Sequence, residues 1–241
     1  MIYSIKRTVS PHDLDYNNVA SASAVLRFMQ EAAYCHMYFY PPTLDDLRAE
    51  NKAFVVSRLS MSIYAPLYAC EEITVQTWAC ESKGASFPRC ARILRGDEVV
   101  AELSSVWALI DLDKKTILRA DAYQASYTCE EPIELDLPSR VRVPRDTELT
   151  LAGEYTVSYN DVDINKHINN THYPDIICCF LPKLDGRRVI KFAISYLREA
   201  PLGEQIKVYT SRESDGEIWV RTVNHDGSTN VEVQVVLDTL Q

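Results

Sequence analysis

The 241-residue sequence lacks the features of membrane, secreted and fibrous proteins. No segment approaches the roughly 20 consecutive apolar residues that span a bilayer, and seven glycines and eleven prolines are too few for a fibrous or low-complexity chain. The first residues, MIYSIKRTVSPHDLD, contain neither an apolar stretch after the basic residues nor an Arg/Ser-rich amphipathic stretch. We therefore expect a soluble globular protein without a signal or transit peptide, located in the cytoplasm.

The cysteine and charge patterns argue against two further classes. The seven cysteines are an odd number, contain no C-x-x-C pair and lie mostly among apolar neighbours, which favours reduced structural thiols over disulfides or a metal site. Thirty-four acidic against 25 basic residues give a formal net charge of −9, which repels a polyphosphate backbone. We expect no nucleic-acid partner.

Internal similarity indicates how the chain is divided. HDLDYN at residues 12–17 and NDVDIN at 160–165 share the pattern D-x-D-x-N, and APL recurs at 65–67 and 200–202. Each APL is followed by an acidic residue and an I-x-V strand pattern. The order is the same in both halves, which indicates two copies of one domain. The first copy is the longer between these anchors, and we expect its extra residues at YFYPPTLDDLRAEN.

Each copy has the same predicted order of elements. A short alternating strand precedes the polar motif, a helix follows it, and several long alternating strands come after the helix. Ser21 or Ser23 can cap the first helix, and Asn169 or Asn170 can cap a shorter helix that continues through the apolar run IICCFL. The separators RGDE, SDGE and HDGS are typical of hairpin turns, which join antiparallel neighbours.

These elements predict an α+β fold in which each copy is a long antiparallel sheet curled around one central helix. We expect a first domain over residues 1–122, a linker over 123–149 and a second domain over 150–241. The linker contains CEEPIELDLPSRVRVPRD, whose three prolines and mixed charge are typical of a connecting segment.

The second copy holds an acid, an amide and an imidazole at alternate positions, Asp163, Asn165 and His167. Neither a regular strand nor a regular helix brings all three side chains to one reacting atom, whereas a curled loop that runs into a helix amino terminus does. The free N–H groups and positive dipole end of that terminus, near Asn169 and Asn170, suit an oxyanion. Asparagines at these two positions are also typical caps and turn formers.

The first copy separates the catalytic interpretation from the structural one. It keeps Asp15 and Asn17 but has Val19 where the second copy has His167. If the polar residues only formed the turn, both copies would need them equally, and nothing would single out the histidine. We therefore predict one active site per chain, in the second copy.

The run DVDINKHINNTHY resembles the D-x-D-x-N-x-H-[IV]-N-N-x-x-Y signature of hotdog-fold thioesterases. Almost the whole chain, including SSVWALIDLDKKT and ISYLREA, is similar to the acyl-ACP thioesterases of bacteria and plants. The resemblance implies a tandem double hotdog fold, no cofactor, and a catalytic set of Asp163, Asn165, His167 and Glu199. Glu199 ends the strand pattern VIKFAISYLRE, and the residue after it, a cysteine in plant members, is Ala200 here, so a thiol mechanism is not available at that position.

The resemblance implies hydrolysis of fatty acyl-[acyl carrier protein] thioesters, which releases the free fatty acid and ends chain elongation in fatty acid biosynthesis. Asp163 or Glu199 would activate water or attack directly, and Asn165 would orient the water or the carboxylate. His167 would stabilise charge and return the proton, while N–H groups at the helix terminus would hold the oxyanion. The residues leave the general-base and acyl-anhydride routes both open.

The resemblance also implies two binding surfaces. The first copy would supply much of the acyl tunnel through side chains that are equally typical of a plain core: Leu26, Met29, Met61 and Trp107. The acidic acyl carrier protein would need a local basic patch. We expect this patch, which can also be read as a solvated loop, shortly after the catalytic helix: Lys183, Arg187, Arg188 and Lys191.

Two alternatives share the fold. An acyl-CoA thioesterase usually has single hotdogs that pair as dimers, and an acyl-thioester-binding regulator would not need His167 and Glu199. A metal hydrolase that uses His167 and His172 is disfavoured because their five-residue step matches no trusted zinc spacing and no H-E-x-x-H is present. We expect a monomer or homodimer with no metal, cofactor or membrane partner.

Overall fold

A computed structural model describes residues 1–240. Gln241, the last residue of the expected second domain, lies outside the described residues. The elements of the first half are β1 (Tyr3–Thr8), the 3₁₀ turn η1 (Pro11–Asp13), α1 (Ala22–Phe39), α2 (Leu44–Ala49), β2 (Lys52–Ile63), β3 (Glu72–Ala79), β4 (Phe87–Arg95), β5 (Glu98–Asp111), β6 (Thr116–Leu118) and η2 (Ala120–Ala122).

The second half repeats this order with a shorter helix. Its elements are β7 (Thr150–Thr156), η3 (Tyr159–Asp161), η4 (Asn170–His172), α3 (Tyr173–Cys178), β8 (Arg187–Tyr196), β9 (Gln205–Thr210), β10 (Glu217–Val223) and β11 (Thr229–Thr239). The helix α2 lies within YFYPPTLDDLRAEN, where the extra residues of the first half were expected.

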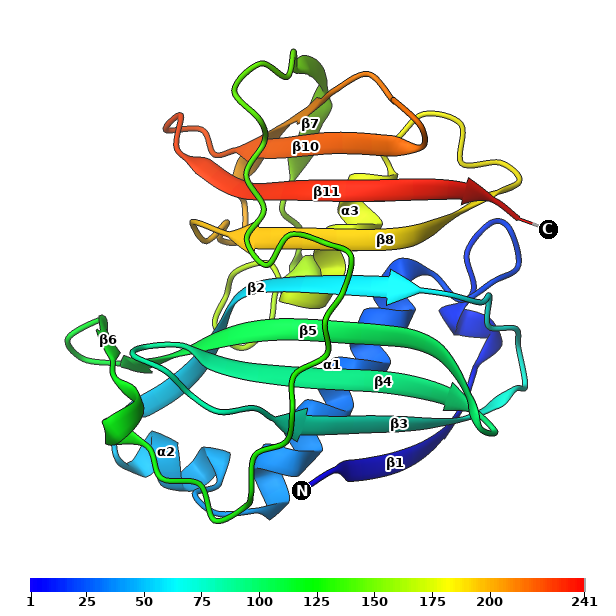
Figure 1. Ribbon diagram of the computed structural model, residues 1–241. Coiled ribbons are helices and arrows are strands. Elements are labelled where there is room, and N and C mark those ends of the chain that lie inside the picture. Colours follow the sequence, from blue (N-terminus) through cyan, green and yellow to red (C-terminus); the bar gives the residue numbers. More distant parts are fainter. Residues whose placement is uncertain (241) are drawn as a thin grey trace.

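The strands form one antiparallel sheet of mirrored order. The sequence of neighbours is β1-β3-β4-β5-β2-β8-β11-β10-β9-β7, with β6 paired to β5. The five strands of the second half thus follow those of the first in reverse order. The halves join where β2 and β8 pair antiparallel, from Arg58 opposite Ser195 to Ser62 opposite Lys191. Figure 1 shows the two half-sheets side by side, with α1 behind one and α3 behind the other. The predicted antiparallel sheet with few helices is confirmed.

Of the two central helices, α1 begins as the sequence predicts, whereas α3 begins after His172 and has no side-chain cap. Ser21 caps α1, because its hydroxyl accepts the N–H of Ala24 at 3.1 Å. The helix α3 has only six residues, since Asn169 caps the 3₁₀ turn η4 first, and the expected continuation through Phe180 and Leu181 is wrong. Pro182 explains the early end, because the residue before a proline is disfavoured in the helical region.

The backbone contacts correct the alignment of the halves. The N–H of Val9 donates to the carbonyl of Glu71, and the equivalent bond of the second half runs from the Val157 N–H to the Glu204 carbonyl. Likewise, the Ala20 N–H donates to the Leu67 carbonyl, and the Ile168 N–H donates to the Ala200 carbonyl. Leu67 therefore corresponds to Ala200, and the two APL triplets are two residues out of register with each other. It follows that the counterpart of Glu199 in the first half is Pro66.

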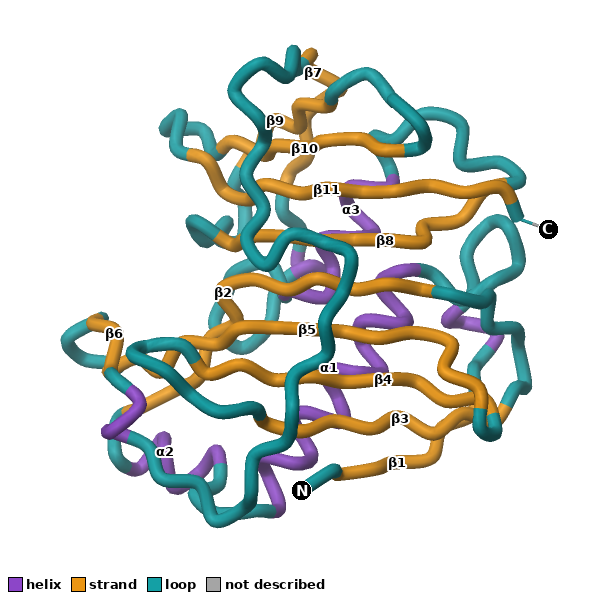
Figure 2. The backbone as a smooth tube through the Cα atoms, viewed as in Figure 1, coloured by secondary structure: helices purple, strands orange, loops and turns teal. Residues whose placement is uncertain are grey.

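Residues 123–149 contain neither helix nor strand and cross from one half to the other. Figure 2 shows this loop in front of the sheet, on the face away from α1 and α3. Two serines next to the β2–β8 junction hold it there: the hydroxyl of Ser60 donates to the Pro138 carbonyl at 2.9 Å, and that of Ser195 accepts the Val141 N–H at 3.0 Å. No helix within residues 1–240 combines the length and the apolar character that crossing a membrane requires.

Candidate active site

The motif loop of the second half is curled, as its residue spacing predicts. The N–H of Asn165 donates to the Asp163 carboxylate at 2.8 Å, and the N–H of Asp163 donates to the carbonyl of His167 at 3.2 Å. Lys166 completes the turn with a positive φ of 64°. The first half contains the same turn, with Asn17 bonded to Asp15 at 2.8 Å and Asn18 at φ 61°. These bonds of Asp163 are therefore turn-forming contacts that both halves share.

Asp161 belongs to the architecture of the loop. Its carboxylate accepts the N–H and hydroxyl of Ser158, each at 2.7 Å, and the hydroxyl of Tyr155 at 2.8 Å. Burial raises the pKa of Asp161, but these donors outweigh that effect and hold its pKa below the usual value. The corresponding Asp13 accepts the N–H of Ser10 in the first half.

His167 and Glu199 are brought together. Nε2 of His167 lies 3.7 Å from Oε1 of Glu199, which is longer than a direct hydrogen bond. The other ring nitrogen, Nδ1, lies 3.2 Å from the carbonyl of Ile168. Because a carbonyl only accepts, this contact places the proton of the neutral ring on Nδ1 and leaves Nε2 free to accept.

The side chains of His167 and Glu199 differ in solvent exposure. The side chain of Glu199 is 77% exposed, and that of His167 is 23% exposed. His167 also forms an isolated bridge with Pro201, which connects the motif loop to the segment after Glu199. The pair is thus open to a substrate and held from both sides by backbone contacts.

Asn165 and its counterpart Asn17 have different surroundings. The Asn17 side chain donates to the carbonyls of Leu184 and Arg187 and accepts the N–H of Gly186, at 2.7 to 2.9 Å. Within residues 1–240 the amide of Asn165 makes no such bond and is exposed. An amide that serves the fold in one half is therefore available to a ligand in the other.

The helix start offers one N–H group. Asn169 acts as a cap, since its side-chain oxygen accepts the N–H of Thr171 at 2.9 Å and its own N–H donates to Asp161. The carbonyl of Asn170 accepts the hydroxyl of Tyr196 at 3.0 Å, whereas no acceptor for the Asn170 N–H is present within the described chain. Of the two asparagines, Asn170 is therefore the one whose N–H has no partner among the described residues.

The first half lacks the two side chains that define this site. Val19 stands in place of His167, and Pro66 stands in place of Glu199. A cavity of about 310 Å³ lies between this part of the first half and the α3–β8 region of the second. Val19, Pro66 and Leu67 line it on one side, and Pro174, Cys178 and Arg188 line it on the other. Neither Val19 nor Pro66 has a side chain that can accept a proton, so the first half has no counterpart of the His167–Glu199 pair.

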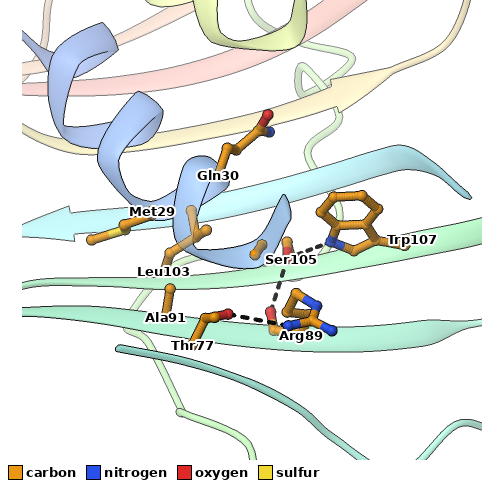
Figure 3. A pocket seen from close by; sticks show the side chains of 9 residues that line it. Met29, Gln30, Thr77, Arg89, Ala91, Leu103, Ser105 and Trp107 are labelled. Carbon is orange, nitrogen blue, oxygen red and sulfur yellow. Dashed lines mark hydrogen bonds between the residues drawn. The ribbon is translucent and has the colours of Figure 1, made fainter. Parts of the chain in front are cut away.

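A second, much smaller cavity lies between α1 and strands β3 to β5 (Figure 3). Its volume is about 10 Å³, close to that of a single water, and Met29 and Trp107 line it. Leu26 and Met61, also expected to bind the acyl chain, are fully buried in the core and do not line it. Arg89, only 5% exposed, faces this space and bonds Nδ1 of His36 at 3.0 Å.

The expected docking residues lie away from His167. Lys183 lies in the loop before β8, Arg187 and Arg188 begin the strand, and Lys191 lies near its middle. The ten residues of β8 span about 33 Å, and Glu199 follows the opposite end of the strand. Arg187 pairs with Glu213, Lys191 pairs with Asp136, and Arg188 donates to backbone carbonyls of Ile63 and Tyr64. These residues do not form a free basic patch beside the candidate site.

Sequence reasoning did not single out Asn230, which is fully buried behind the strand end that carries Glu199. In the sequence it follows the hairpin HDGST and is indistinguishable from a turn residue. Within residues 1–240, no group of three or more His, Cys, Asp or Glu side chains is arranged to hold a metal ion.

Two family descriptions match the chain. "Acyl-ACP thioesterase N-terminal domain" matches residues 2–126, and "Acyl-ACP thioesterase C-terminal domain" matches residues 145–237. The Arabidopsis thaliana protein "Oleoyl-acyl carrier protein thioesterase 2, chloroplastic" is 22% identical over 94% of this chain and 67% of its own length. The corresponding protein of Coriandrum sativum is 22% identical over 92% and 65%. The chain thus spans about two thirds of these plant relatives.

Solved structures show the same fold. The chain superposes on an acyl-ACP thioesterase from Bacteroides thetaiotaomicron with a TM-score of 0.89 and 22% identity, covering 98% of each chain. A 12:0-ACP thioesterase from Umbellularia californica gives a TM-score of 0.81 with 14% identity over 99% of this chain and 97% of that one.

Proposed function

The chain belongs to the acyl-ACP thioesterase family, and we propose that it hydrolyses fatty acyl-[acyl carrier protein] thioesters and releases the free fatty acid. Acylated carrier protein is then the substrate, and release of its chain ends elongation in fatty acid biosynthesis. The observation that carries the proposal is the approach of His167 and Glu199 in the second half, at positions where the first half has Val19 and Pro66.

We further propose that the fold is a tandem double hotdog. The first domain covers residues 1–122, the linker 123–149 and the second domain 150–241. The mirrored strand order and the shared motif turn support this division. The monomer or homodimer and the cytoplasmic location expected from the sequence stay predictions.

The proposed reaction uses a water bound beside His167 and Glu199. Glu199 accepts a proton from the water, whose oxygen attacks the thioester carbonyl carbon. The Asn170 N–H donates to the carbonyl oxygen as it becomes negative, and the exposed amide of Asn165 orients the water or the carbonyl. The carbon–sulfur bond then breaks, and the proton returns through His167 to the leaving thiolate, which gives a free thiol and a carboxylic acid.

Asp163 contributes its negative charge beside this site in addition to its turn-forming bonds. Asp163→Asn separates the two roles, because an asparagine oxygen can still accept the Asn165 N–H while the charge is lost. A thiolate whose conjugate acid has a pKa near 8.5 leaves readily, so the reaction needs the attacking oxygen and the oxyanion donor more than a strong acid.

The direct experiment incubates the purified protein with acyl carrier protein and CoA esters of several chain lengths and measures free thiol. We expect faster release from the carrier-protein substrates. Faster release from CoA esters would instead establish the acyl-CoA thioesterase alternative, and binding without release of thiol from any ester would establish the regulator alternative.

A further inference from the structure

Asn230 is the extra residue of a β-bulge at the start of β11. The register between β10 and β11 shifts after Thr222, which leaves Asn230 opposite no residue. Its carbonyl oxygen accepts two N–H groups of the strand end before Glu199, from Leu197 at 2.9 Å and Arg198 at 3.1 Å. Bulges of this kind often re-aim a strand beside an active site.

The side chain of Asn230 binds the same strand end and two further elements. Nδ2 donates to the Arg198 carbonyl and, at 3.0 Å, to the hydroxyl of Tyr173 at the start of α3. Oδ1 accepts the hydroxyl of Thr222 in β10 at 2.7 Å. Asn230 therefore forms hydrogen bonds with both the N–H and the carbonyl of Arg198, the residue before Glu199.

The first half has the same backbone arrangement without the polar side chains. The register of β4 and β5 shifts after Ile93, which leaves Val100 as the bulge residue. The carbonyl of Val100 accepts the N–H groups of Tyr64 and Ala65, as that of Asn230 accepts those of Leu197 and Arg198. Val100 thus corresponds to Asn230, and Ile93 corresponds to Thr222.

The third position follows from the motif turn. Val25 lies eight residues after Asn17, as Tyr173 lies eight residues after Asn165. All the members of both sets are buried: Val25, Ile93 and Val100 in the first half, and Tyr173, Thr222 and Asn230 in the second. The fold is therefore built once with an apolar set at these positions and once with a polar set.

A buried polar cluster has a cost that an apolar one does not, since each group loses its hydration and must find a partner. The first half shows that the bulge and the strand end form without it. The polar set occurs in the half that contains His167 and Glu199, and it bonds the residue before Glu199. The polar set is thus not needed to form the bulge, and it accompanies the candidate site.

We propose that Asn230, held in place by Thr222 and Tyr173, is a positioning residue that fixes Glu199 relative to His167. The inference rests on the proposed function and adds to it a residue that touches neither substrate nor reacting atoms. Positioning has a large effect on rate, because a displacement of about 1 Å at a reacting group can cost about 100-fold.

The test replaces Thr222 and Asn230 with apolar residues of similar size in the double variant Thr222→Val/Asn230→Val. Position 230 then carries valine, as the corresponding position 100 of the first half does. We expect kcat for acyl carrier protein substrate to fall about 10- to 100-fold, with KM nearly unchanged. The thermal midpoint should fall, since the Tyr173 hydroxyl, the Arg198 carbonyl and the Val231 N–H each lose a partner. Thr210→Val, at a buried threonine that does not bond Asn230, is the matched control and should leave kcat unchanged. Tyr173→Phe is a second, milder variant that removes one hydroxyl from the cluster and keeps the ring.

Two readouts distinguish positioning from a structural role. In a Glu199→Gln background the Thr222→Val/Asn230→Val change should lower kcat by less than about 3-fold, since the side chain that it displaces no longer takes part in the reaction. Amide hydrogen exchange of residues 197–202 should become faster in Thr222→Val/Asn230→Val, and it requires no activity. An unchanged kcat in a folded variant, the same loss in both backgrounds or unchanged exchange would overturn the proposal. A wild type that cleaves no thioester would refute the proposed function, while the exchange measurement would still decide the positioning.

Discussion

Nε2 of His167 lies 3.7 Å from Oε1 of Glu199, although the two residues belong to separate segments of the second half. The histidine comes from the loop before α3, and the glutamate follows the end of β8. The same two positions of the first half hold Val19 and Pro66, which cannot exchange protons. One chain therefore contains the shared architecture twice and the His–Glu pair once.

Asn17 and Asn165 are a matched pair for separating stability from activity. Asn17→Ala removes three hydrogen bonds to residues 184–187 and should lower the free energy of unfolding by about 3 kcal/mol, at about 1 kcal/mol for each bond. Asn165→Ala removes no side-chain bond and should leave stability nearly unchanged while kcat/KM falls about 100-fold. Denaturant unfolding and thiol release check both. The reverse pattern would contradict the assignment of Asn165 to the chemistry.

Met29 should limit the length of the bound acyl chain. It lines the small cavity between α1 and the sheet, so Met29→Ala should extend that cavity and shift the preference toward longer chains. Met61→Ala is the control, since Met61 is equally buried but does not line the cavity. Each variant should lose about 2 to 5 kcal/mol of stability. Relative kcat/KM across a series of chain lengths should change for Met29→Ala and stay constant for Met61→Ala.

His36 should make stability depend on pH. Burial, and next the positive charge of Arg89, lower the pKa of His36 from 6.5 to about 4 in the folded protein. Between pH 6.5 and 4 the unfolded chain binds the proton more readily, so the free energy of unfolding falls as the pH falls through this window. The loss attributable to His36 should be on the order of 2 kcal/mol. His36→Gln should remove this component, so that the stability difference between wild type and variant shrinks from pH 7 to pH 4.5. A constant difference would contradict the buried neutral ring.

Carrier-protein docking should depend on basic residues beside His167 rather than on the loop before β8. Lys166 and Arg198 are exposed, and each adjoins a residue of the candidate site. Lys166→Glu and Arg198→Glu should raise KM for acyl carrier protein several-fold at low salt, with little effect on CoA esters. Lys183→Glu makes the same charge change in the loop before β8 and should have little effect. An increase in KM for Lys183→Glu alone would restore the patch that the sequence suggested.

The motif spacing and the repeat made much of this arrangement predictable. The alternate positions of Asp163, Asn165 and His167 required a curled loop, and the valine at position 19 indicated which half carries the chemistry. The antiparallel strands followed from hairpin turns and alternating apolar residues. These are local signals, which depend on neighbours in the chain.

What the sequence could not provide depends on contacts between distant segments. The repeated APL triplet suggested an alignment that the backbone bonds shift by two residues, because strand pairing and not triplet identity fixes the register. The sequence also did not show that Arg187 and Arg188, two of the basic residues expected to dock the carrier protein, lie at the opposite end of β8 from Glu199. Asn230 has no distinguishing sequence signal, since its role depends on a bulge and on Tyr173 from another element.

The most direct measurement is thiol release from acyl carrier protein substrate by the wild type, His167→Ala and Glu199→Gln, with His172→Ala as a control five residues from His167. Removal of an acid–base group typically costs 10²- to 10⁴-fold in rate. We predict losses of this size for the first two variants, all four proteins being equally folded, and activity within about 3-fold of wild type for His172→Ala. Equal turnover by the wild type, His167→Ala and Glu199→Gln would contradict the assignment of this pair as the catalytic centre.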